Sequence, residues 1–280
     1  MNNDEFYIGW MPAAPSRLTK RVRKIIAGIG GSVLAAGLVL SLGQKKFSTS
    51  TFEFGTPTEV KGVYHSLPVP SLKVVSKPDM FGRSATITMP LVGYGKFGAE
   101  GVMDKLEKEN NLSLDNKEVT LKGTLLYSDG KTLLQVDSHD QPLVRVGKID
   151  PSSSVQVKDL GLVSLNGEIL DPKCYFGVMK PGHGKPHRDC AIRCIAGGIN
   201  PVFYTRSSYG ETTYYLILDE HGKKINDELR NYVADPVSLE AKAIQYDDWI
   251  VLYTKKETIK RTGGLSWFKT KEASISCGPR

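Results

Sequence analysis

One long run of the sequence carries no charge: residues 25–43, IIAGIGGSVLAAGLVLSLG, whose only polar side chains are Ser32 and Ser41. In a helix its nineteen residues rise roughly 28 Å, about the thickness of the hydrocarbon layer of a bilayer. No other stretch of the sequence is comparable. We therefore expect a single transmembrane helix at residues 25–43.

Basic residues crowd the N-terminal side of this run. Five of them lie at positions 17–24, whereas Lys45 and Lys46 follow the run and oppose the pattern weakly. Positive charge favours the cytoplasmic side, so we expect a cytoplasmic segment, residues 1–24, and a body in the bacterial periplasm, anchored to the inner membrane. A cleaved signal peptide is the alternative. The length of the apolar run and of the segment before it favours an anchor.

Small residues line one face of the expected helix. Ala27, Gly31 and Ala35 stand at i, i+4 and i+8, a spacing that lets a second helix approach closely in lipid. The stripe predicts a partner helix, and hence a subunit of a membrane complex.

The formal net charge of +7 is concentrated at the start of the chain. Residues 1–46 carry seven basic and two acidic residues, a net +5, which leaves +2 (+7 minus +5) for the other 234 residues. A nucleic-acid-binding surface needs its Lys and Arg on the folded body. The sequence therefore argues against a nucleic-acid partner.

The periodicity beyond residue 47 is mostly that of β-strands. Residues 119–136 and 237–254 are two hairpin-like segments that align without gaps, each preceded by strand-like runs and a short polar stretch of helical character. This order is that of an OB-type barrel, a small five-stranded Greek-key fold. We predict a mainly β protein with two OB-like units, residues 47–147 and 158–256, and a C-terminal tail, residues 257–280. A single larger β-sandwich is the alternative.

The second unit contains a loop rich in Cys and His, residues 171–198. Pro186 and the pair Gly197-Gly198 bracket a run that we expect to form a helix. His187, Cys190 and Cys194 stand at i, i+3 and i+7 of such a helix and share one face. We expect Cys174 to close over that face from the preceding strand. The predicted zinc site is Cys₃His, and thiolates also suit copper or an iron–sulfur cluster. Its ligands are Cys174, His187, Cys190 and Cys194.

Two other readings of the same cysteines stay open. In an oxidising compartment Cys174 pairs with Cys190 or Cys194 in a disulfide, with Cys277 pairing with the remaining thiol or staying free. Alternatively Cys190, in the first turn of the expected helix, is a reactive thiol with His187 as its base. No acid partner for a catalytic triad can be assigned from the sequence, so an enzyme is not the favoured class.

The loop also carries a resemblance. The chain resembles a group of uncharacterised bacterial membrane-anchored proteins with an F-Y-I-G-W-type start, one span, and a D-x-K-C-x-x-G…K-P-H-x-x-C-A-x-x-C…G-G-I-x-P loop. Here these elements are Phe6–Trp10, residues 25–43 and Asp171–Pro201. The resemblance implies a shared site and supplies no activity.

The first functional hypothesis is an anchored accessory subunit of a membrane redox or respiratory assembly, whose loop binds a metal or is redox-active. A structural envelope protein with a disulfide-stapled loop, and a thiol-dependent enzyme, are the competing hypotheses. The metal, the partner subunits and any substrate stay open at this point.

Overall fold

The computed structural model describes residues 14–44, 50–75, 80–81, 84–137, 141–149 and 154–262. Contacts divide the chain into two units, Met1–Ser48 and Thr49–Arg280. The aromatic start Phe6–Trp10, the tail beyond residue 262 and Cys277 lie outside the described residues.

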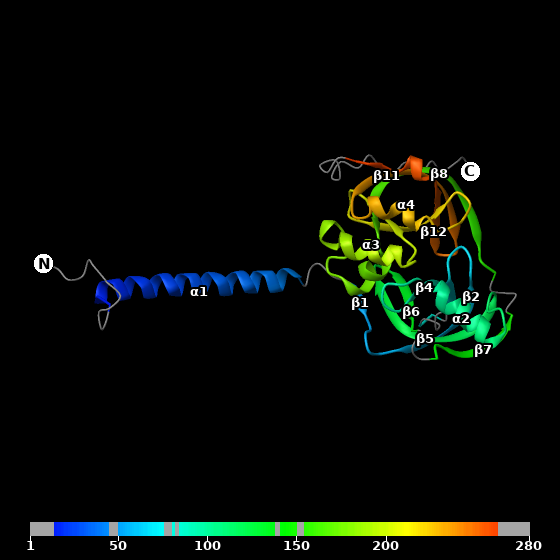
Figure 1. Ribbon diagram of the computed structural model, residues 1–280, viewed down its shortest axis with the longest axis horizontal. Coiled ribbons are helices and arrows are strands. Elements are labelled where there is room, and N and C mark those ends of the chain that lie inside the picture. Colours follow the sequence, from blue (N-terminus) through cyan, green and yellow to red (C-terminus); the bar gives the residue numbers. More distant parts are fainter. Residues whose placement is uncertain are drawn as a thin grey trace. The chain divides into compact units, whose positions relative to one another are not determined.

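The first unit contains one helix, α1 (Ser16–Gln44), among its described residues (Figure 1). The helix is long and apolar enough to cross a membrane, judged by length and composition. The hydroxyl of Ser32 donates a hydrogen bond of 2.9 Å to the carbonyl oxygen of Gly28, so this polar group is satisfied within the helix. A membrane anchor is the role that such a helix suits.

The second unit opens with a closed five-stranded barrel. Each strand pairs with its neighbour in the order β5-β2-β3-β4-β6, and β6 returns to β5; β4 and β6 are parallel and the other pairs antiparallel. Helix α2 (Glu100–Asn110) connects β4 to β5. The strands are β2 (Thr58–His65), β3 (Ser71–Val75), β4 (Thr86–Gly93), β5 (Lys117–Ser128) and β6 (Lys131–Val136).

A second barrel repeats this connectivity. Its order is β11-β8-β9-β10-β12, closed by β12 on β11, with β10 and β12 parallel. The short helical segments α4 (Asn226–Leu229) and η4 (Arg230–Tyr232) replace α2, and β13 (Lys260–Arg261) and η5 (Lys256–Thr258) follow. The strands are β8 (Val157–Leu170), β9 (Val202–Arg206), β10 (Thr212–Asp219), β11 (Pro236–Tyr246) and β12 (Trp249–Thr254). The predicted fold class, mainly β with small barrel units, is confirmed.

The two matching hairpins share a backbone feature at their turns. Asp129 and Asp247, aligned in the sequence, both have positive φ, 48° and 51°. Each begins a two-residue turn between antiparallel strands, the geometry that suits the twist of a tight hairpin. Asp tolerates this left-handed conformation better than most side chains, which explains why both turns can use it.

Two short strands were not expected. β1 (Thr51–Phe52) and β7 (Leu143–Ile149) both add to β5, and β7 extends two residues beyond the predicted end of the first unit at residue 147. The cause is a difference in length. β6 covers only Gly123–Ser128 of β5, so the first residues of β5 remain available for β7.

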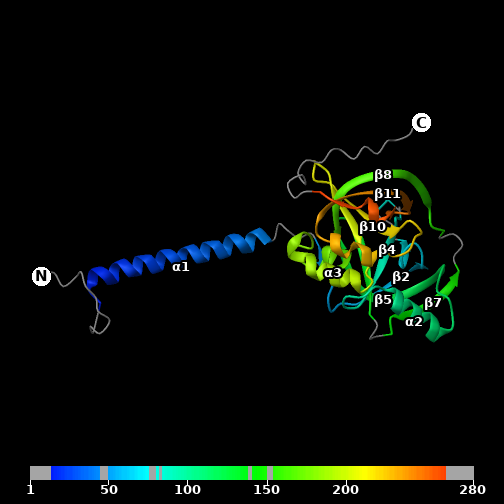
Figure 2. The ribbon, with the colours of Figure 1, turned by 45° about the horizontal axis from the view of Figure 1, so that its top comes forward.

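The two barrels lie against each other (Figures 1 and 2). Each has its own apolar core, and a third cluster joins residues of both, with Leu126 and Leu133 from the first barrel and Trp249 from the second. A largely buried ion pair, Lys73–Asp247 at 3.0 Å, crosses the same interface. This shared core also contains Cys174 and Cys194.

Candidate metal centre

The Cys/His loop begins directly after strand β8. The carboxylate of Asp171 accepts hydrogen bonds from the backbone N–H groups of Lys173, at 3.0 Å, and Cys174, at 3.4 Å. These bonds satisfy N–H groups that a first turn leaves without partners, and a short helical turn, η2 (Cys174–Val178), follows. We had expected Cys174 to come from the preceding strand, but it belongs to this turn.

The loop then enters helix α3 (Arg188–Ala196) through the turn η3 (Lys185–His187), which contains Pro186. The helix ends at the predicted glycines, where Gly198 has φ of +97°, a conformation that favours glycine. The buried face of α3 carries Ala191, Cys194 and Ile195. The predicted helix is present and begins one residue later than expected, because His187 is its N-cap.

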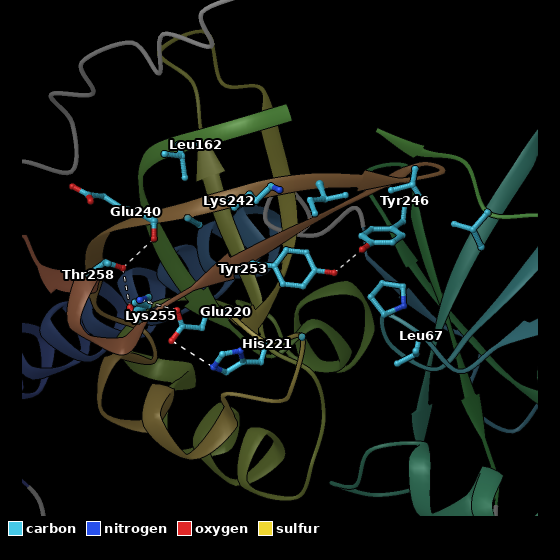
Figure 3. Close-up of a pocket in the computed structure, with 16 residues that line it drawn as sticks. Leu67, Leu162, Glu220, His221, Glu240, Lys242, Tyr246, Tyr253, Lys255 and Thr258 are labelled. Atoms are coloured by element: carbon cyan, nitrogen blue, oxygen red, sulfur yellow. Dashed lines mark hydrogen bonds and ion pairs between the residues drawn. The ribbon is translucent and has the colours of Figure 1, made fainter. Parts of the chain in front are cut away.

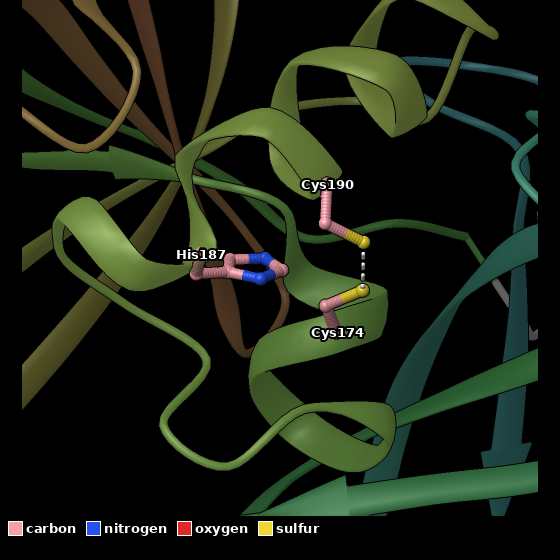
Figure 4. A group of neighbouring side chains, drawn as sticks. All are labelled: Cys174, His187 and Cys190. Atoms are coloured by element: carbon pink, nitrogen blue, oxygen red, sulfur yellow. Dashed lines mark hydrogen bonds between the residues drawn. The ribbon is translucent and has the colours of Figure 1, made fainter.

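The structure brings three of the four predicted ligands into one group (Figure 4). One donor atom each from Cys174, His187 and Cys190 lies within 4.8 Å of the others. The two sulfur atoms, Sγ of Cys174 and Sγ of Cys190, are 3.6 Å apart. In Figure 4 the imidazole lies beside this pair of sulfurs.

The fourth predicted ligand, Cys194, lies in a second group that shares Cys174. Asp171, Cys174 and Cys194 place one donor atom each within 4.8 Å of one another, and all three residues are buried. Cys174 is thus the residue common to both groups. The carboxylate of Asp171 was not among the predicted ligands, although it directly precedes the Pro-Lys-Cys sequence.

His187 is the least satisfied polar side chain of the cluster. It is 1% exposed, and neither Nδ1 nor Nε2 has a hydrogen-bond partner. A buried polar atom without a partner costs free energy comparable to a lost hydrogen bond. Burial also lowers the pKa of His187, which keeps the imidazole neutral, the form that coordinates metals.

The environment of Cys174 raises the pKa of its side chain, whereas that of His187 lowers it. A hydrogen bond with Cys194, together with burial, raises the pKa of the Cys174 thiol. Without a metal this sulfur therefore holds its proton. A metal would displace the proton, since only the thiolate coordinates.

A lysine from the first barrel completes the cluster, and sequence reasoning missed it. Lys96 lies on the loop between β4 and α2, and its Nζ donates to Sγ of Cys190 at 3.0 Å and contacts Sγ of Cys194 at 3.8 Å. The hydrogen bond to Cys190 raises the pKa of Lys96. Ninety-four residues separate Lys96 from Cys190, so no local spacing could indicate the contact.

Lys173 fixes the loop that carries Lys96. Its Nζ donates to the carbonyl oxygens of Gly93 and Gly95, both at 2.7 Å, and burial lowers the pKa of Lys173 to about 8. The same loop meets the end of α3 backbone to backbone, since Gly98 N–H donates to Gly197 O at 3.0 Å. The glycine-rich stretch 93–98, which leads from β4 to α2, is therefore one wall of the site.

Two acidic residues of the second barrel hold the rest of the loop. Asp235 accepts ion pairs from Lys185, Arg188 and Arg261. Glu168 accepts a hydrogen bond of 2.5 Å from the N–H of Gly184. His183, the other histidine of the loop, stacks on Tyr204 with ring centres 6.3 Å apart.

A separate hollow lies mainly on the second barrel, with Leu67 and Pro68 of the first barrel also in its lining (Figure 3). It has a volume of about 900 Å³, and the hydroxyls of Tyr246 and Tyr253 are 2.7 Å apart in its wall. Its one histidine, His221, is 74% exposed and lies 3.7 Å from Glu220. No cysteine lines it, so the Cys/His cluster is the stronger candidate site despite the size of this hollow.

Fold and cluster together define a class: a two-barrel protein with a membrane-anchor-like helix and a buried thiol and imidazole site between the barrels. Comparison with known proteins adds no narrower class. No family model matches the chain, and no curated protein matches its sequence.

Proposed function

We propose that this chain is a membrane-anchored accessory protein that binds one thiophilic divalent metal ion, with zinc as the best fit. Cys174, His187, Cys190 and Cys194 are the ligands, as in a Cys₃His site. The observation that carries the proposal is His187, a buried neutral imidazole within 4.8 Å of two thiols, with both ring nitrogens unpartnered. A metal ion supplies the partner that this side chain lacks.

The charges around the cluster favour a divalent ion. A tetrahedral site would contain three thiolates, and Asp171 adds a carboxylate. Lys96 contacts the sulfurs and Lys173 lies next to Cys174, so the two ammonium groups contribute two positive charges. With an ion of charge 2+, the buried group is formally neutral, which avoids the cost of burying net charge.

A structural disulfide would explain the close thiols but not the buried imidazole of His187. A bond between Cys174 and Cys190 would remove two thiols but leave the nitrogens of His187 without partners. A metal ion satisfies the sulfurs and the imidazole together. The metal is therefore preferred over the disulfide as the resting state.

Elemental analysis of the full chain, extracted in detergent, tests the proposal. We expect about one zinc ion per chain, and loss of that zinc in His187→Gln and Cys194→Ser. His221→Gln is the matched control, because His221 is exposed, pairs with Glu220 and lines a hollow without cysteines. A wild-type protein without metal after reconstitution with zinc, or a His187→Gln protein that retains it, would contradict the proposal.

The wider role proposed for the chain is that of an exported subunit of a membrane redox assembly. The basic residues before the span support an exported body, and the stripe Ala27, Gly31 and Ala35 supports a partner helix.

A further inference from the structure

The two thiols in closest contact differ in their access to solvent. Cys174 is 3% exposed, whereas Cys190 is only partly buried. Their sulfur atoms are 3.6 Å apart, against about 2.05 Å in a disulfide. A small rotation about the side-chain bonds would bring them to bonding distance, and only Cys190 is open to a molecule from outside.

Cys190 also has the surroundings of an attacking thiol. It is the third residue of α3, so it lies in the first turn of the helix. The ammonium group of Lys96 contacts its sulfur at 3.0 Å. Sulfur attacks a disulfide as the thiolate, and this ammonium group contacts the sulfur atom from which the attack would start.

We propose that the metal-free protein carries out thiol–disulfide exchange, with Cys190 as the attacking thiol and Cys174 as the resolving thiol. The substrate class is a disulfide small enough to reach a half-buried sulfur. Cys194, at 2% exposed, takes no part in the exchange. The inference shares two residues with the metal site but does not require that a metal binds.

The exchange proceeds in two steps. Sγ of Cys190 attacks one sulfur of the disulfide R–S–S–R, a mixed disulfide forms, and the first R–S⁻ leaves and takes up the proton that Cys190 gave up. Sγ of Cys174 then attacks Sγ of Cys190, and the second R–S⁻ leaves with the proton of Cys174. One external disulfide is reduced to two thiols, and the protein dithiol is oxidised to the Cys174–Cys190 disulfide.

Metal and exchange therefore compete for the same sulfurs. A bound ion holds Cys174 and Cys190 as ligands, and the disulfide removes two of the four ligands. Oxidation by a disulfide would thus release the metal proposed above, and only this consequence rests on the proposed function.

Oxidised glutathione is the probe for the test. The full chain in detergent, stripped with a chelator, is incubated with it, and the non-reduced peptides are analysed by mass spectrometry. We expect a Cys174–Cys190 disulfide and two glutathione molecules released per chain, as the stoichiometry above requires. Stable glutathione on wild-type Cys190, or a disulfide that includes Cys194, would overturn the proposal.

Variants separate the roles of the residues. Cys174→Ser, with Cys174→Ala as a second substitution of the buried site, should trap glutathione on Cys190. Lys96→Met should slow formation of the mixed disulfide roughly tenfold, the effect of losing one charge-assisted contact, and Lys96→Arg should restore most of the rate. Equal rates in the wild type and Lys96→Met would remove Lys96 from the proposal, and no trapped adduct in either Cys174 variant would refute the order of attack.

Cys194→Ser distinguishes this inference from the proposed function. It should lose zinc but still form the Cys174–Cys190 disulfide. A wild type that binds zinc but makes no Cys174–Cys190 disulfide when stripped overturns only the exchange. A wild type that makes the disulfide but binds no zinc supports the exchange and overturns only the metal site.

Discussion

Glu168, a buried residue of β8, connects the barrel to the Cys/His loop through a hydrogen bond. Its side chain is 4% exposed, and burial raises its pKa to about 7 from an ordinary value near 4.5. It nevertheless accepts the hydrogen bond from Gly184 N–H that holds the loop. The folded protein therefore binds the Glu168 proton more tightly than the unfolded chain does.

The sign of the resulting pH dependence follows from linkage. The stability that Glu168 contributes is fully present below about pH 4.5 and is lost as the pH rises through about 7. Glu168→Gln cannot ionise, so we expect the variant to be more stable at pH 8 by on the order of 1–3 kcal/mol. Thermal unfolding of the metal-free protein in detergent, followed by circular dichroism at pH 5 and pH 8, measures the difference.

Glu59→Gln provides the control for this prediction, because Glu59 lies at the exposed start of β2. It should leave the pH profile of unfolding as in the wild type. A Glu168→Gln protein whose profile between pH 5 and pH 8 matches that of the wild type would show that Glu168 does not titrate as described.

At the level of elements, two glycine segments let the barrels approach at the site. A Cβ on Gly197, at the end of α3, would overlap the backbone oxygen of Lys96. A Cβ on Gly98 would in turn overlap the backbone oxygen of Gly198. Backbone cannot move aside as the end of a flexible side chain can, so these positions accept only glycine without displacement of a loop.

We expect Gly197→Ala to lower the free energy of unfolding by about 1–3 kcal/mol, the usual cost of overpacking, and to weaken zinc binding by displacing Lys96. Denaturant unfolding and zinc titration measure the two effects. Gly101→Ala is the matched control, since nothing lies within 4 Å of a Cβ there and alanine suits helix α2 better than glycine. Equal losses in both variants would exclude a role for the close contact.

The sequence was sufficient for elements that carry local signals. Strands of period two, the turn at Asp129-Gly130 and the helix between Pro186 and Gly197 could all be predicted from residues a few positions apart. Lys96 could not, because its contact with Cys190 depends on how two barrels pack. The strand β7 was missed for a similar reason, since it pairs with the part of β5 that β6 leaves uncovered.

For the whole molecule, the anchor and the proposed assembly make one prediction. A tag fused after Arg280 should be exported, whereas a tag before Met1 should stay cytosolic, because the basic residues at 17–24 precede the span. The same C-terminal tag should recover a second membrane protein after extraction in mild detergent. Protease accessibility in spheroplasts and native mass measurement are the two readouts.

Either half of this prediction can fail alone. A cytosolic C-terminal tag would overturn the exported location and place the thiols in a reducing compartment. A monomer without any associated membrane protein would overturn the subunit role but leave the metal site in place.

The apolar cluster that joins the two barrels has a thermodynamic consequence. Because residues of both barrels pack around Cys174 and Cys194 in that cluster, unfolding of either barrel would expose the apolar core of the other, and the two should melt in one cooperative transition. A metal ion whose free concentration is a hundred times its dissociation constant would raise the free energy of unfolding by about 2.7 kcal/mol. A single atom would thereby stabilise two barrels that are each built from their own strands.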